Sequence, residues 1–110
     1  LVGAISAGCT AVLKSSPYTP TVDAVMREMV EATFSSEYIA YTQGGRDKNR
    51  ELLAERWDMI FYTGSPAVGR VVMQAAAKNL TPCVLELGGK SPCIVDKAAD
   101  IIGEFKNEKI

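Results

Sequence analysis

The sequence predicts an α/β fold of Rossmann type, an open and mostly parallel sheet with helices on both faces. Short apolar runs alternate with longer segments whose apolar residues recur at helical spacing, which is typical of stacked βαβ units. The apolar runs show little polar alternation, as expected of parallel strands that are covered on both faces. The 110 residues are enough for one small domain.

Two strands and a helix are expected in the first part of the chain. Residues 11–13 and 38–41 are apolar or aromatic runs of strand length. Between them, Thr19 is expected to cap a helix, since a proline follows in its first turn. The apolar stripe of this helix reaches Thr33, and Asp23 falls off that stripe.

Strands and helices continue to alternate in the second part. Asp47 is expected to cap a helix that reaches about Glu55. Ser65 is expected to cap a second helix, which begins with Pro66 and runs to about Lys78, because serine before proline is a helix-start signal. Further strands are expected at residues 59–62, 83–87 and 93–95.

Charge and composition exclude several classes of function. Lys plus Arg number 12 and Asp plus Glu number 13, so nothing points to nucleic acid as a partner. Histidine is absent, which removes any His base or His metal ligand. Cys9, Cys83 and Cys93 have apolar neighbours; we expect buried, reduced thiols and no metal site. No apolar run reaches the roughly 18–20 residues that span a bilayer.

A glycine-containing turn joins the predicted strand 59–62 to the following helix. Free N–H groups and the positive end of the helix dipole make such a turn an anion site. Gly64 permits the tight turn, and Gly69 permits close approach of the helix to a neighbour or a ligand. An ordinary turn with Ser65 as cap is equally compatible with this spacing. A phosphate loop of the NTPase kind is disfavoured because Arg70 replaces its lysine.

Two charged residues stand at predicted carboxyl ends of strands, where open α/β sheets bind ligands. Glu86 lies in an otherwise apolar strand, so its pKa is expected to be raised, which suits a general base. The alternative is that Glu86 faces solvent or pairs with a lysine. Lys14 follows the first strand and could reach a cofactor phosphate or ribose; the alternative is a solvated charge.

Three blocks together resemble the NAD(P)-dependent aldehyde dehydrogenase superfamily. Residues 61–69 match its F-T-G-S-x-x-x-G turn, with Tyr62 as an additional residue, and residues 85–92 match its E-L-G-G-K-S-P signature. Residues 7–14 resemble A-G-N-x-V-V-L-K. The sequence is most similar to the class 3 and fatty aldehyde dehydrogenase branch. The resemblance implies a partial NAD(P)-binding domain over residues 1–100 and a divergent C-terminal tail over residues 101–110.

The resemblance implies roles for the cofactor-binding residues. Ser65 would contact the pyrophosphate of NAD or NADP, within a turn formed with Gly64 and Gly69. Lys14 would bind the adenosine ribose of NAD or the 2′-phosphate of NADP. Gly88 would form the backbone turn beside the nicotinamide. A proline stands at residue 17, where the family has a glutamate that grips the ribose, so the preference for NAD over NADP is open.

The resemblance implies part of an enzyme that oxidises aldehydes to carboxylic acids, with Glu86 as the general base that activates water. The family's nucleophilic cysteine lies in a G-Q-x-C segment, which none of Cys9, Cys83 and Cys93 matches. The isolated chain is therefore expected to be inactive. The alternative is a catalytically inactive fragment or a small nucleotide-binding or interaction module.

The expected partner is a small-molecule aldehyde, with no nucleic acid, and the family is usually homo-oligomeric. The expected location is cytoplasmic, although this branch can carry a membrane-associating C-terminal segment.

Overall fold

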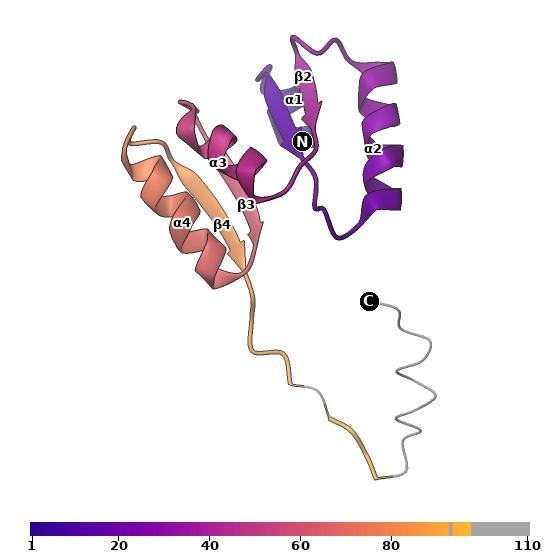
Figure 1. The fold of residues 1–110 in the computed structure, drawn as a ribbon, viewed down its shortest axis with the longest axis vertical. Helices are drawn as coiled ribbons and strands as arrows, with labels where there is room; N and C mark the ends of the chain where they lie inside the picture. Colours follow the sequence, from indigo (N-terminus) through magenta and orange to yellow (C-terminus); the bar gives the residue numbers. More distant parts are fainter. Residues whose placement is uncertain (93, 98–110) are drawn as a thin grey trace.

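The computed structural model describes residues 1–92 and 94–97 of the chain (Figure 1). Parallel strands alternate with helices from α2 onward, as the sequence predicts. The elements in order are α1 (Val2–Ser6), β1 (Ala11–Lys14), α2 (Pro20–Thr33), β2 (Ile39–Thr42), α3 (Arg46–Ala54), β3 (Ile60–Gly64), α4 (Pro66–Ala77) and β4 (Cys83–Leu87).

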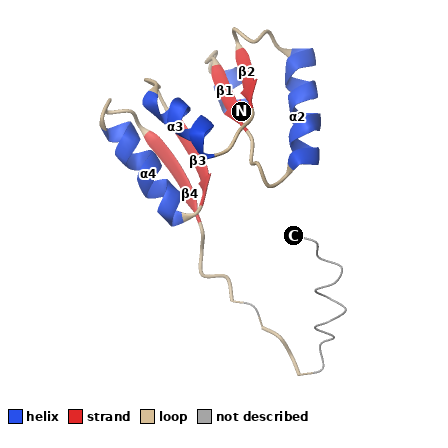
Figure 2. Cartoon of the chain, in the orientation of Figure 1, coloured by secondary structure: helices blue, strands red, loops and turns tan. Residues whose placement is uncertain are grey.

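The four strands form two separate parallel pairs, β1 with β2 and β3 with β4. Figure 2 shows β1 and β3 as the inner strands of the two pairs. A Rossmann sheet in the order 3-2-1-4-5-6 separates its strands 3-2 from 4-5 by strand 1. The pair β2–β1 corresponds to strands 3-2 of that order, and the pair β3–β4 corresponds to strands 4-5. No described strand takes the place of strand 1 between them. The α/β class of the prediction is confirmed, but the described residues do not form one continuous sheet.

Each strand pair has a small core of its own against a helix. Helix α2 packs on β2, whereas α4 packs on both β3 and β4 and also contacts α3. Val30 of α2 and Ile39 of β2 are buried in one core, and Val72 and Ala76 are buried residues of α4 in the other. Figure 1 shows α2 on the outer side of one pair and α3 and α4 beside the other.

The buried side of α2 differs from the predicted apolar stripe. Val22, Val25 and Met29 belong to that stripe but are exposed, while Asp23, expected off the stripe, is buried with Val30. The reason is that α2 packs mainly on one strand, β2, so only a narrow strip of the helix is covered. Asp23 lies in that strip because hydrogen-bond partners on the strand side hold it there.

The predicted strands and helices up to residue 87 are found, and many of their bounds shift by one or two residues. Helix α3 has Gly45 at its N-cap; Asp47, the predicted cap, lies in its first turn and pairs with Arg50 at 3.6 Å. Thr19 stands at the N-cap of α2 without a capping bond, and its hydroxyl donates to the Ser16 carbonyl oxygen at 3.5 Å.

Three further features differ from the predictions or lie beyond what the structure describes. The short helix α1 was not expected. Ile94 and Val95, predicted to lie in a fifth strand, belong to no strand. Cys93 and the predicted tail at residues 101–110 fall outside the described residues.

The two described cysteines are more exposed than the sequence predicts. Cys9, expected to be buried, is exposed because it lies in the loop between α1 and β1, and Cys83 is half-buried. Within residues 1–92 and 94–97, no side-chain group is placed to hold a metal ion. In the same residues, no helix combines the length and the apolar character needed to cross a membrane.

Candidate cofactor-binding and catalytic site

The turn between β3 and α4 has the local geometry of an anion site. The Ser65 hydroxyl accepts a hydrogen bond from the Val68 N–H at 3.3 Å, and the Ser65 carbonyl oxygen accepts one from the Gly69 N–H at 2.9 Å. Ser65 is therefore the predicted N-cap of a 12-residue helix. The first turn of a helix leaves N–H groups without intrahelical acceptors, at the positive end of its dipole. These groups can receive a phosphate.

The two glycines of this turn have different surroundings. A Cβ on Gly69 would lie 2.7 Å from Cδ2 and 3.2 Å from Cδ1 of Leu87, so the absence of a side chain lets α4 approach β4 closely. A Cβ on Gly64 would overlap the hydroxyl of Tyr62. The sequence predicts that Gly69 allows close approach to either a neighbouring element or a ligand. The structure shows the close approach to a neighbouring strand, β4.

Glu86 lies beside this turn because of the register between β3 and β4. Thr63 pairs with Glu86, and Gly64 pairs with Leu87. Leu87 faces α4, where it meets Gly69. Because side chains alternate along a strand, Glu86 points to the opposite face.

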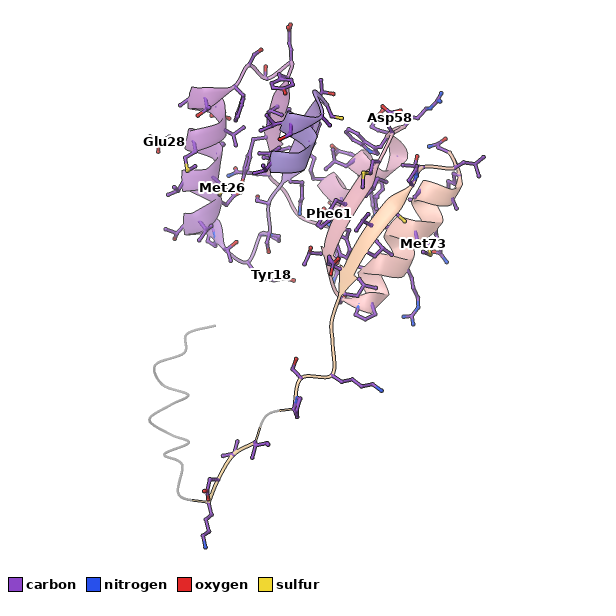
Figure 3. The ribbon with its side chains drawn as sticks, turned by 180° about the vertical axis from the view of Figure 1, so that it is seen from behind. Tyr18, Met26, Glu28, Asp58, Phe61 and Met73 are labelled. Atoms are coloured by element: carbon purple, nitrogen blue, oxygen red, sulfur yellow. The ribbon has the colours of Figure 1, made fainter. Side chains whose placement is uncertain are left out.

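The opposite face of this pair is open. It also carries Phe61, which is 66% exposed, and Val84, its pairing partner. Figure 3 shows Phe61 and the α4 residue Met73 on opposite sides of the pair. The side chain of Glu86 is exposed. Of the two predicted alternatives for Glu86, the structure therefore has the solvent-facing one, and no described element encloses this face in apolar residues.

Gly88 follows the end of β4 and is exposed. A Cβ placed on it would meet no atom within 4 Å. The position leaves space for a ligand next to the end of the strand that carries Glu86.

Lys14 lies at the carboxyl end of β1, in the other strand pair, and the structure does not bring it to the β3–α4 turn. It lines a cavity with a volume of about 280 Å³. Within the described residues, Lys14 forms no ion pair. The residues lining the cavity come from the end of β1, the start of α2 and β2: Leu13, Lys14, Ser15, Ser16, Thr19, Val22, Asp23, Met26 and Tyr41.

A buried carboxylate in this cavity was not found by the sequence analysis. The Tyr41 hydroxyl donates to Oδ1 of Asp23 at 2.7 Å, and the Gln43 side-chain amide donates to Oδ2. Hydrogen bonds from Ser15, Tyr41 and Gln43 lower the pKa of Asp23 below its usual value. Burial and the bond to Asp23 raise the pKa of Tyr41. The partners lie 18 and 20 residues away, so no local spacing could reveal the cluster.

Comparison with known proteins decides the family. A sequence profile described as "Aldehyde dehydrogenase family" matches residues 1–106. The chain belongs to the aldehyde dehydrogenase family. Its relatives include several named as family 3 members, which confirms the predicted branch.

The relatives of this aldehyde dehydrogenase chain come from distant organisms. The 4,4′-diaponeurosporen-aldehyde dehydrogenase of Staphylococcus aureus is 46% identical over 101 residues, which cover 92% of this chain and 22% of that protein. Aldehyde dehydrogenase family 3 member H1 of Arabidopsis thaliana is 46% identical, over 92% of this chain and 21% of that protein. The chain thus spans about a fifth of the length of these relatives.

Solved aldehyde dehydrogenase structures share the fold of this chain. The substrate-bound Staphylococcus aureus AldH matches with a TM-score of 0.80 and 46% identity, over 91% of this chain and 22% of that one. The Mycobacterium tuberculosis aldehyde dehydrogenase complexed with NAD+ matches with a TM-score of 0.72 and 38% identity, over 93% of this chain and 22% of that one. The predicted fold class is confirmed by these similarities.

Proposed function

We propose that this chain is the central NAD(P)-binding portion of an aldehyde dehydrogenase and supplies its cofactor-binding turn and general base. The observation that carries the proposal is the register of β3 with β4, which pairs Thr63 with Glu86 next to the capped turn at Gly64 and Ser65. Paired strands lie about 4.8 Å apart, so the anion site and the candidate base are neighbours. The similar structure of the Mycobacterium tuberculosis aldehyde dehydrogenase complexed with NAD+ supports this choice of ligand.

The residues present fit a dinucleotide. A capped helix N-terminus at Ser65 offers N–H groups and a positive dipole to a pyrophosphate. Lys14 and hydroxyl-bearing residues line a cavity at the end of β1, and these could bind a ribose. Gly88 leaves open space beside Glu86. When bound, the nicotinamide accepts a hydride from the substrate carbon.

Glu86 acts on water in the proposed mechanism. Its carboxylate accepts a proton from a water molecule, and the resulting hydroxide adds to the acyl carbon of an enzyme thioester. The carbon–sulfur bond then breaks, the thiolate leaves, and a carboxylic acid is released. The exposed side chain of Glu86 gives water access to the carboxylate.

The nucleophilic cysteine is not supplied by the described part of this chain. Cys83 is the first residue of β4, and Cys9 precedes β1. Both therefore lie at the amino ends of strands, opposite the edge that carries Ser65 and Lys14. Cys93 lies outside the described residues, and its sequence context does not match the nucleophile segment of the family.

The family also suggests the substrate, cofactor, location and assembly of the complete enzyme. The substrate is a small-molecule aldehyde, and the cofactor is NAD or NADP. The active form is a cytoplasmic homo-oligomer, as is usual in the family.

Two variants at residue 65 test the cofactor site. Asp and Asn cap helices about as well as Ser, so Ser65→Asp and Ser65→Asn should both fold. Asp adds a negative charge where the pyrophosphate would bind, while Asn adds none. Calorimetric titration with NAD+ should show at least about tenfold weaker binding for Ser65→Asp than for Ser65→Asn. Equal affinities for the two variants would overturn the placement of the pyrophosphate.

An activity assay tests whether this chain supplies the general base but not the nucleophilic cysteine. The isolated chain should produce no NADH from a long-chain aldehyde, because it lacks the nucleophile. NADH formation at a rate that is lost in Glu86→Gln would contradict this.

The alternative of an inactive fragment or an interaction module has one observation in its favour. The open face of β3 and β4 leaves Phe61 and Met59 exposed, and such apolar faces promote association. A monodisperse chain that binds NAD(P) tightly would favour a nucleotide-binding module. An aggregating chain that does not respond to the cofactor would favour an inactive fragment.

A further inference from the structure

The cavity at the end of β1 is small for a ligand pocket. Its volume is about 280 Å³, at the lower limit of the roughly 300–1,000 Å³ typical of pockets for drug-sized ligands. It opens at the carboxyl ends of parallel strands, where open α/β folds bind nucleotides. Hydroxyl groups of Ser15, Ser16, Thr19 and Tyr41 line it together with Lys14.

Asp23 is the acidic residue among those that line this cavity in the described part of the chain. It is 9% exposed, and its carboxylate is fixed by hydrogen bonds from Tyr41 and Gln43. An ionised carboxylate has about four acceptor positions. The hydrogen bonds from Tyr41 and Gln43 leave acceptor capacity on this carboxylate for a ligand hydroxyl.

We propose that Asp23 accepts a hydrogen bond from the adenosine ribose 2′-hydroxyl and thereby selects NAD over NADP; this inference rests on the proposed function. In nucleotide-binding α/β folds, an acidic side chain commonly accepts this hydroxyl. The same charge repels the 2′-phosphate that distinguishes NADP. The lowered pKa of Asp23 keeps the charge present at neutral pH.

Binding of two small probes to the full chain tests the selection. 5′-AMP carries a free 2′-hydroxyl, and 2′,5′-ADP carries a phosphate there. Calorimetry should show at least about tenfold tighter binding of 5′-AMP by the wild-type chain. In Asp23→Asn this preference should fall by about tenfold or more. The matched control Asp58→Asn changes an exposed aspartate at the amino end of β3 (Figure 3), and it should leave the preference unchanged.

A second measurement needs no variant and remains decisive if Asp23→Asn fails to fold. The wild-type chain should bind 2′-deoxy-AMP more weakly than 5′-AMP, because the proposed hydrogen bond to Asp23 is then missing. Equal affinity for the two nucleotides, or a preference for 2′,5′-ADP over 5′-AMP, would overturn the proposal.

The outcome also separates this inference from the proposed function. If NAD+ binds but the 2′ position has no influence, only the role of Asp23 is wrong. If the chain binds neither NAD+ nor 5′-AMP, the proposed function fails, and this inference fails with it.

Discussion

Replacement of Gly69 by Ala tests whether this residue serves helix–strand packing. The added Cβ would lie 2.7 Å from Cδ2 of Leu87, well inside normal contact distance. Gly69 is a buried residue near the start of α4, so the helix itself cannot move away without disturbing its core. The end of the Leu87 side chain must move instead. Leu87 is 39% exposed, which gives it room to do so.

Two effects of opposite sign determine the size of the change. Alanine in a helix interior is more favourable than glycine by about 0.5–1 kcal/mol. Overpacking a core typically costs about 1–3 kcal/mol, and the partial freedom of Leu87 favours the lower part of that range. We expect Gly69→Ala to change the free energy of unfolding by about 0–1 kcal/mol, in the destabilising direction. In a Leu87→Ala background the clash is absent, so Gly69→Ala should stabilise by about 0.5–1 kcal/mol.

A double-mutant cycle measures this difference. Urea denaturation of the wild type, both single variants and the double variant can be followed by the fluorescence of Trp57, the only tryptophan of the chain. The half-buried Trp57 donates to the Leu52 carbonyl oxygen at 2.6 Å and should respond to unfolding. We expect a coupling energy of about 1–2 kcal/mol between the two sites. A value below about 0.5 kcal/mol, the usual limit of additivity, would refute the packing role.

Three further changes should have measurable effects. Ser65→Ala removes the acceptor for the Val68 N–H and should destabilise the chain by about 1 kcal/mol in urea denaturation; no loss would show that the cap is unimportant. Ile39→Val, at a residue that is 1% exposed, should cost about 0.5–1.5 kcal/mol, whereas the same change at Ile94, 92% exposed, should have almost no effect on the melting temperature. The pKa of Asp23 is lowered from its usual value of 3.8, so the ionised carboxylate stabilises the fold fully at pH values above 3.8. This stabilisation is lost as the pH falls through the lowered pKa. The free energy of unfolding should therefore fall less steeply with decreasing pH in Asp23→Asn than in the wild type. Identical pH profiles for the two proteins would contradict the stabilising role of the Asp23 carboxylate.

Features set by local sequence signals were predictable. Ser65 followed by Pro66 marks the start of α4 by cap chemistry and by the fixed φ of proline, and the structure begins the helix there. The apolar run 83–87 forms β4 with the predicted bounds. The family signatures also marked the turn at residues 64–69 and Glu86 as candidate site residues, because those motifs are contiguous in sequence.

Features that depend on tertiary contacts were not predictable. Asp23 looks like a solvent-facing residue in a helix, and its burial follows from partners on β2 and directly after it, which the sequence places 18 and 20 residues away. The sequence left open whether Glu86 is enclosed or faces solvent, because a strand's own apolar residues cannot reveal that one face of its sheet is uncovered. The short helix α1 has no side-chain cap and no buried residue, so it gave no pattern to detect.

Nuclear magnetic resonance titration of the isotope-labelled chain with NAD+ tests the central claim most directly. If the β3–α4 turn and the β1 cavity bind one dinucleotide, the amide signals of Ala67, Val68, Ser15 and Ser16 should shift together with a single dissociation constant. Signals from the exposed side of α3 should stay in place. Shifts that are absent from both segments, or that follow two unrelated affinities, would contradict the account of this chain as an NAD(P)-binding unit.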